Sequence, residues 1–112
     1  MKYVPLIKSG KPKQRFQIGR HTAVLLGDIE SAGSVEYLYI LVVFDGDTQE
    51  PCYFIASEVN SMLKHFGGGS HFLGVFYGEG HATCGDSDDW ADEAKFTAEA
   101  LRIVSEKYGG QA

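Results

Sequence analysis

The sequence of 112 residues is poor in cysteine and proline and lacks any long apolar run. Its two cysteines, Cys52 and Cys84, are too few for the disulfide framework of a small secreted domain, so we expect free thiols. The longest apolar stretch, Tyr37 to Phe44, is far shorter than the roughly 20 residues needed to span a bilayer. No apolar signal-peptide region is present near the start. These absences predict a cytoplasmic protein with no membrane partner.

Carboxylates are missing from the first 20 residues, which carry six of the ten lysines and arginines. Residues 21–112 therefore hold four basic against fifteen acidic side chains, a charge of −11, whereas the whole chain carries −5. A nucleic-acid-binding globule presents a basic face on a basic domain, so this balance argues against nucleic acid as a partner. The basic segment either pairs with the acidic remainder or gathers on one face that contacts nucleic acid or anionic lipid.

A single α+β domain over residues 1–112, with a frayed tail at 109–112, is expected from the length and the 44% hydrophobic content. Alternating apolar positions and runs of β-branched residues predict strands over 16–26, 35–44, 52–56 and 71–77, with 3–7 as an additional edge strand. The segment 9–13 is predicted as a turn and 78–89 as a loop. Gly74, inside a predicted strand, indicates that another group approaches the backbone closely there.

Two helices are predicted. Ser57 is a favourable N-cap, and apolar residues recur at helical spacing from Val59 to Phe66, which predicts a helix of about two turns. A long helix is predicted from about Ser87 to Tyr108. Its apolar arc is wider than a one-sided surface helix requires, so the flank of the helix either packs against a curved sheet or contacts another subunit. The order (β)βββαβα therefore predicts a mostly antiparallel sheet of four to five strands, with one short and one long C-terminal helix packed on one face.

The predicted loop 78–89 is the segment richest in reactive side chains, and rigidly held loops commonly carry sites. His81 and Cys84 are candidate catalytic residues, as a base and a thiol nucleophile. The surrounding carboxylates oppose that chemistry, because they would raise the pKa of the thiol. A structural interpretation is that Ser87, or Asp86 with Asp89, caps the long helix. The candidate binding residues are Glu79, Asp86, Asp88, Asp89 and Trp90, together with Tyr37 and Tyr39.

Metal binding is weighed against ligand spacing. A zinc site needs four ligands, and His81 and Cys84 supply two, so His65, His71 and Cys52 are the further candidates. The acidic segments 45–50 and 86–91 both depart from the calcium-loop pattern at the third ligand and at the required glycine. The spacing thus defines no complete metal site, and no cofactor is expected.

Two hypotheses of function follow. The first is a non-enzymatic protein-interaction or oligomerisation domain with an acidic surface, which forms a homodimer or binds another, basic protein. The second is a small metal- or thiol-dependent enzyme that uses His81, Cys84 and the aspartates of the loop. The first is favoured because no complete catalytic constellation stands in the sequence, while its fourteen aromatic residues exceed what one core needs.

Overall fold

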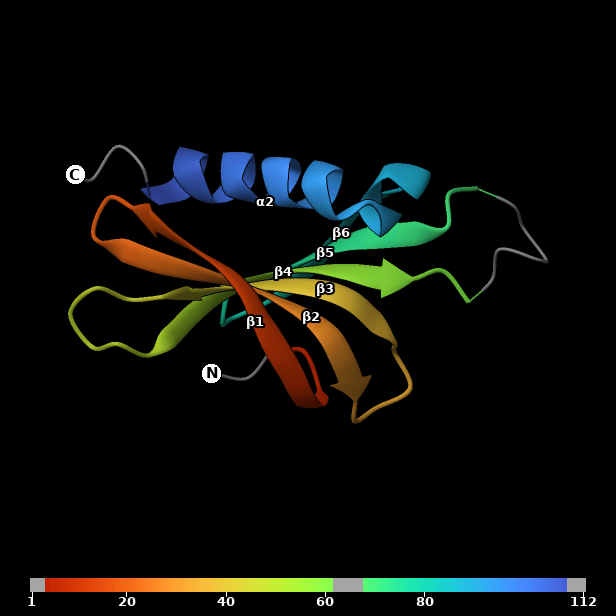
Figure 1. Ribbon diagram of the computed structural model, residues 1–112, viewed down its shortest axis with the longest axis horizontal. Helices are drawn as coiled ribbons and strands as arrows, with labels where there is room; N and C mark the ends of the chain where they lie inside the picture. The colour runs from red at the N-terminus through yellow and green to blue at the C-terminus, as the bar shows by residue number, and fades with distance from the viewer. Residues whose placement is uncertain (1–3, 62–67, 109–112) are drawn as a thin grey trace.

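The computed structural model describes residues 4–61 and 68–108, which form one antiparallel sheet of six strands with a long helix on it (Figure 1). The strands lie side by side in the order of the sequence, from β1 to β6. They are β1 (Ile7–Ile18), β2 (His21–Ser31), β3 (Tyr37–Phe44), β4 (Pro51–Val59), β5 (His71–Phe76) and β6 (His81–Ser87). A 3-10 turn, η1 (Asp88–Ala91), then leads into the helix α2 (Glu93–Tyr108). None of the helical segments in these described ranges is long and apolar enough to cross a bilayer.

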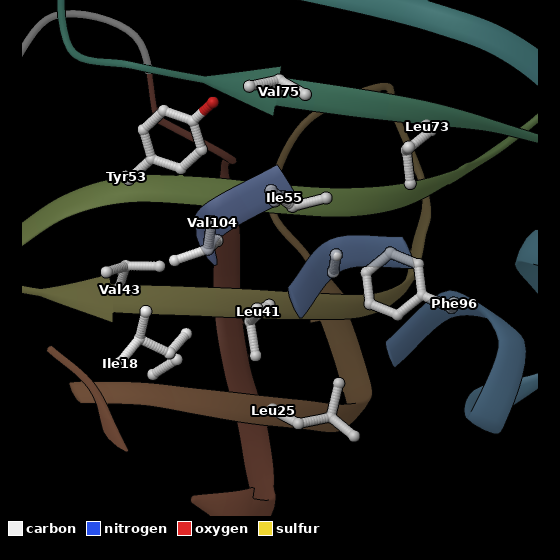
Figure 2. Packing of buried hydrophobic residues seen from close by; sticks show 12 residues of the cluster. Ile18, Leu25, Leu41, Val43, Tyr53, Ile55, Leu73, Val75, Phe96 and Val104 are labelled. Carbon is white, nitrogen blue, oxygen red and sulfur yellow. The ribbon is translucent and has the colours of Figure 1, made fainter. Parts of the chain in front are cut away.

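The helix α2 covers one face of the sheet, which we call the helix-side face. Phe96, Ala100 and Val104 are fully buried and recur every four residues, so they form one stripe on α2. Figure 2 shows this stripe lying over alternate residues of the strands β2 to β5. The strand residues of this core are Ala23, Leu25, Leu41, Val43, Tyr53, Ile55, Leu73 and Val75, with Ile18 at the end of β1.

A second apolar cluster lies on the opposite face of the sheet, which carries no helix among the described elements. Its members on β3, β4 and β5 are buried although no second layer stands over them. Cover comes from the long hairpin of β1 and β2, in which β1 crosses the neighbouring strands at a steep angle (Figure 1). The buried members are Tyr37, Ile40, Val42, Phe54, Ala56 and Phe76, and the covering residues include Val4, Ile7, Leu26 and Ile29.

The predicted strands are wrong in number and in bounds. The segment 16–26, predicted as one strand, contains the end of β1, a turn at 19–20 and the start of β2, and residues 4–6 of the predicted edge strand lie outside any strand. Residues 9–13, predicted as a turn, belong to β1, and residues 81–87, predicted as a loop, form β6. Both are edge strands, and an edge strand tolerates proline, glycine and polar side chains because only one of its sides enters the ladder. Hydrophobic alternation is therefore weak in both, and the six-stranded sheet replaces the predicted four to five strands.

The short helix predicted from Ser57 is wrong where the structure describes it, because Ser57, Glu58 and Val59 continue β4. Ser57 pairs with both neighbouring strands and is fully buried, and its hydroxyl donates to the Trp90 carbonyl at 2.6 Å. This tertiary contact overrides the local capping signal. The remainder of that prediction, residues 62–67, lies outside the described residues, as does the predicted tail at 109–112.

The wide apolar arc of the long helix packs partly within the chain, because Phe96 and Val104 are fully buried whereas Ala94 and Ala98 are exposed. Leu101 and Ile103, on its flanks, are half-buried against the helix-side core. Part of the basic N-terminal segment also pairs internally, since Lys13 forms a 2.7 Å ion pair with Glu93 of α2 and Lys8 lies 3.7 Å from Glu30. The acidic remainder of the chain thus neutralises part of the basic edge strand.

Candidate functional site

An acidic cleft opens at the end of the sheet where the β3–β4 loop meets the β5–β6 turn. Its volume is about 720 Å³. Three carboxylates line it, from Asp45 and Glu50 of the first loop and Glu79 of the second. The other lining residues are Thr48, Pro51, Cys52, Tyr77 and Gly78. The two loops are 27 residues or more apart in the sequence, and the β4–β5 pairing brings them together.

Asp45 is fixed in position by its own loop. Its Oδ1 atom accepts hydrogen bonds from the backbone N–H groups of Asp47 at 2.8 Å and Thr48 at 3.0 Å. These two bonds lower the pKa of the Asp45 carboxyl, because they stabilise its charged form. The loop therefore holds a fixed negative charge at the cleft.

Tyr77 gives the cleft an aromatic wall. The residue is 45% exposed, and its ring lies over Gly80, where a Cβ atom would overlap the ring. The neighbouring aromatic surface already binds a cation of this chain, because the Lys107 ammonium lies 5.5 Å from the Tyr53 ring centre and 5.6 Å from that of Tyr108. Carboxylates beside an exposed ring are a combination that recognises ammonium and guanidinium groups.

A second polar cluster lies on the opposite face of the sheet, where Glu58 of β4 reaches His81 of β6. The two side chains are two strands apart, and Gly74 of β5 lies between them. A Cβ atom at position 74 would overlap the Glu58 carboxylate, so the glycine lets that side chain cross the intervening strand. The close approach indicated at Gly74 by the sequence is confirmed. His81 also stacks on Phe76, with ring centres 4.1 Å apart.

The Glu58 carboxyl is buried without full compensation. Its Oε2 atom lies 3.3 Å from Nε2 of His81 but accepts no hydrogen bond from the described residues. Burial raises the pKa of Glu58, and the nearby His81 partly opposes this. Burial, with the Glu58 charge as the next cause, also raises the pKa of Tyr37, the cross-strand neighbour of Glu58.

The variant Glu58→Gln is expected to flatten the fall in stability with rising pH. A carboxyl whose pKa is raised by folding stabilises the fold fully below its ordinary pKa of 4.5, and this contribution is lost as the pH rises through the higher value. Glutamine is neutral at every pH, so its free energy of unfolding should not fall in this way. Relative to the wild type, the variant should become more stable by about 1 kcal/mol between pH 4 and pH 8, a typical size for a buried polar group with incomplete pairing. Urea unfolding at pH 4, 6 and 8 measures the difference, and parallel profiles for the two proteins would contradict it.

The candidate catalytic pair, His81 and Cys84, is separated by the sheet. His81 lies opposite Phe76 of the opposite-face cluster, whereas Cys84 lies opposite Leu73 of the helix-side core. Residues paired across antiparallel strands share a face, so the two side chains point away from each other. Cys84 is an exposed free thiol.

Those candidate metal ligands that the structure describes do not gather either. His71 is half-buried and bonds through Nδ1 to the Ser70 hydroxyl at 2.8 Å, and burial lowers the pKa of its imidazole. His65 lies outside the described residues. Within ranges 4–61 and 68–108, no three side chains of His, Cys, Asp or Glu come close enough together to hold a metal ion.

The aspartates after β6 bind backbone groups. Asp86 accepts from the N–H of Gly69, and Asp88 accepts from the N–H of Ser70 at 2.8 Å. The prediction that Ser87 caps the long helix is wrong, because the Ser87 hydroxyl accepts from the N–H of Asp89 at 3.1 Å and so caps the separate turn η1. The helix α2 is capped by Asp92, which accepts from the N–H of Lys95 at 3.0 Å.

Of two further candidates, Tyr37 is a buried core residue and Tyr39 is half-buried against the helix-side core. Tyr37 belongs to the opposite-face cluster, and Tyr39 stacks on Phe96 with ring centres 5.7 Å apart. Trp90 is half-buried against the helix-side core, and Asp89 lies 3.3 Å from the Lys95 ammonium. Among the candidate binding residues, Glu79 is the one that lines the acidic cleft.

Sequence reasoning missed most of the cleft and the partner of His81. The sequence pattern assigns Asp45 and Glu50 to an acidic segment without a metal site, and it places Glu58 in a predicted helix. The signal available for Glu58 was Gly74, which indicated a close approach without naming the residue that makes it. No family model, curated protein or solved structure matches this chain.

Proposed function

We propose that this chain is a protein-interaction domain whose acidic cleft binds basic side chains of a partner protein. The observation that carries the proposal is the gathering of three carboxylates and the exposed Tyr77 ring around one cleft. Carboxylates attract lysine and arginine over a distance, and the ring face adds a cation–π contact. The charge of −11 on residues 21–112 supports the same kind of partner.

The proposed location is the cytoplasm. Both cysteines are free, and Cys84 is exposed. Reduced, exposed thiols are typical of a compartment that keeps cysteine reduced. This supports a partner encountered inside the cell.

A partner other than a second copy is favoured by the packing of the long helix. The homodimer was motivated by the wide apolar arc of that helix, and the flank residues Leu101 and Ile103 find their contacts in the helix-side core. The enzyme hypothesis needs His81 and Cys84 to act together, and their places on opposite faces of the sheet remove that support.

A short fluorescent peptide that alternates lysine with threonine tests the proposal by anisotropy. We expect saturable binding that weakens as salt rises, because salt screens exposed charges. Glu50→Gln and Glu79→Gln should each weaken binding about three- to fivefold, the size of one exposed charge pair. The double variant should lose about tenfold or more.

The matched control is Asp47→Asn, which removes a charge from the same loop at an exposed position that does not line the cleft. It should leave the affinity within about twofold, because the exposed Asp47 charge is screened by solvent and makes no contact in the cleft. The analogous peptide with glutamate in place of lysine should not bind. Equal affinity of the wild type and the double variant would contradict the proposal.

A further inference from the structure

The two edges of the sheet are protected very differently. The edge strand β1 carries Pro12 among several basic side chains, and its pairing with β2 is interrupted by three register irregularities. Edge lysines, prolines and bulges are the devices by which proteins prevent another strand from pairing with an open edge. The basic residues of β1 are Lys8, Lys11, Lys13 and Arg15.

The other edge, β6, has almost none of these devices. It contains no lysine, arginine or proline, and residues 81–86 are all exposed. Its pairing with β5 is regular from His81 to Cys84, and the one irregularity comes after that stretch, where Gly85 has a φ of 55°. No other strand of the described sheet pairs with β6. Every second residue of such an edge turns its N–H and C=O groups outward, where a further strand can bind them.

Acidic groups flank this open edge at both ends. The cleft with Tyr77 and Glu79 lies at its start, in the turn that leads into β6. Asp86 and Asp88 lie at its end. A strand laid along β6 would therefore meet negative charge at each end, and a basic segment is complementary to that pattern.

A second copy of this chain fits the edge poorly. Two antiparallel β6 strands would bring Glu79 of each copy close to the acidic end of the other, and like charges there are repulsive. The basic strand β1 of a second copy carries Pro12 and three irregularities, which disrupt a ladder. The occupant that suits the edge is an extended segment of a different protein.

We propose that a basic, extended segment of the partner protein adds to β6 as a seventh strand of the sheet. This inference rests on the proposed function and specifies how the partner binds. Main-chain hydrogen bonds to β6 provide the affinity, and a basic side chain at one end of the segment enters the acidic cleft.

The test uses the lysine–threonine peptide in two N-methylated forms, one methylated at odd residues and the other at even residues. An extended strand turns alternate N–H groups to opposite sides, so only one form loses the donors that face β6. One form should bind about tenfold or more weakly, and the other should match the unmodified peptide. On binding, alternate amides within 81–84 should become at least about tenfold more protected from hydrogen exchange, because they turn from water to a partner.

A pair of variants places the contact on the sheet. Thr83→Lys gives β6 an edge lysine like those of β1, which hinders pairing with a further strand, and it should weaken binding about tenfold. Gln14→Lys adds the same charge to the exposed opposite edge and should change the affinity by less than about twofold. Trp90 fluorescence and circular dichroism spectra that match those of the wild type show that both variants are folded.

Three outcomes would overturn this inference. If both methylated forms bind alike while the double variant of Glu50 and Glu79 still loses affinity, strand addition fails and the proposed function stands. If the unmodified peptide does not bind, both fail. If sedimentation shows self-association that Thr83→Lys abolishes, the occupant of the edge is a second copy and not a different protein.

Discussion

Replacing Phe96 with alanine is expected to lower the free energy of unfolding by about 3–5 kcal/mol, the usual loss for a large aromatic side chain in a core. Phe96 is fully buried between α2 and the helix-side face, and its ring stacks on Tyr39. The loss removes much of the roughly 5–15 kcal/mol that stabilises a typical domain. Urea unfolding followed by Trp90 fluorescence and circular dichroism measures it.

Two substitutions on the same helix are the controls. Phe96→Leu keeps most of the apolar volume, so its free energy of unfolding should fall by about 2 kcal/mol less than that of Phe96→Ala. Ser105→Ala changes an exposed position and should alter the free energy of unfolding by less than about 0.5 kcal/mol. If Phe96→Ala unfolds at the same urea concentration as Ser105→Ala, the helix is not the cover of this face.

Replacing Gly46 with alanine is expected to destabilise the fold by about 1–3 kcal/mol, a typical result of overpacking. The β3–β4 loop rests on the β1–β2 turn at this point, and a Cβ atom at position 46 would overlap the carbonyl oxygen of Arg20. That oxygen belongs to the backbone, so the whole loop must move. Asp45 and Glu50 move with it, and we expect the lysine–threonine peptide to bind more weakly to the folded variant.

Gly10→Ala is the matched control, because a Cβ atom there comes no closer than 3.4 Å to its neighbours. It should be neutral or slightly stabilising, since alanine has less conformational freedom to lose on folding. Thermal unfolding and anisotropy measure both effects. A Gly46→Ala protein with wild-type stability and wild-type peptide affinity would show that the loop does not depend on this contact.

The central part of the fold was predictable from the sequence. The strand predicted at 35–44 is β3, and the long predicted helix ends at Tyr108 as expected. Both carry strong periodic signals because the sheet buries β3 on two faces and α2 buries one stripe. The strand predicted at 52–56 is also present, but as the longer β4.

The prediction errors occur where backbone pairing between strands, or a tertiary contact, determines the local structure and the hydrophobic pattern does not. Residues 81–87 lie at an edge and bury almost nothing, so no alternation marks them as a strand. Ser57 and Glu58 have the sequence features of a helix start, yet both residues lie in β4 and pair with β3 on one side and with β5 on the other. The helix itself begins at Glu93 after a separate 3-10 turn, because Ser87 and Asp92 cap two different segments.

The candidate site was less predictable than the fold. Glu79 is a candidate from the sequence, and Tyr77 lies in the same turn, but Asp45 and Glu50 join them only through the pairing of β4 with β5. His81 and Cys84 are three residues apart, an odd number of steps that places alternate strand residues on opposite faces. Treating 78–89 as a loop concealed that separation.

The arrangement of Glu58, Gly74 and His81 makes three positions on three neighbouring strands depend on one another for space. A Cβ atom at position 74 would overlap the Glu58 carboxylate and would also lie 3.3 Å from Nε2 of His81. The effect of a substitution at position 74 therefore depends on the residues at 58 and 81, and the three positions are expected to be non-additive in a double-mutant cycle. The glycine, the acid and the imidazole act as one packing unit, so a change in any one of them alters the room available to the other two.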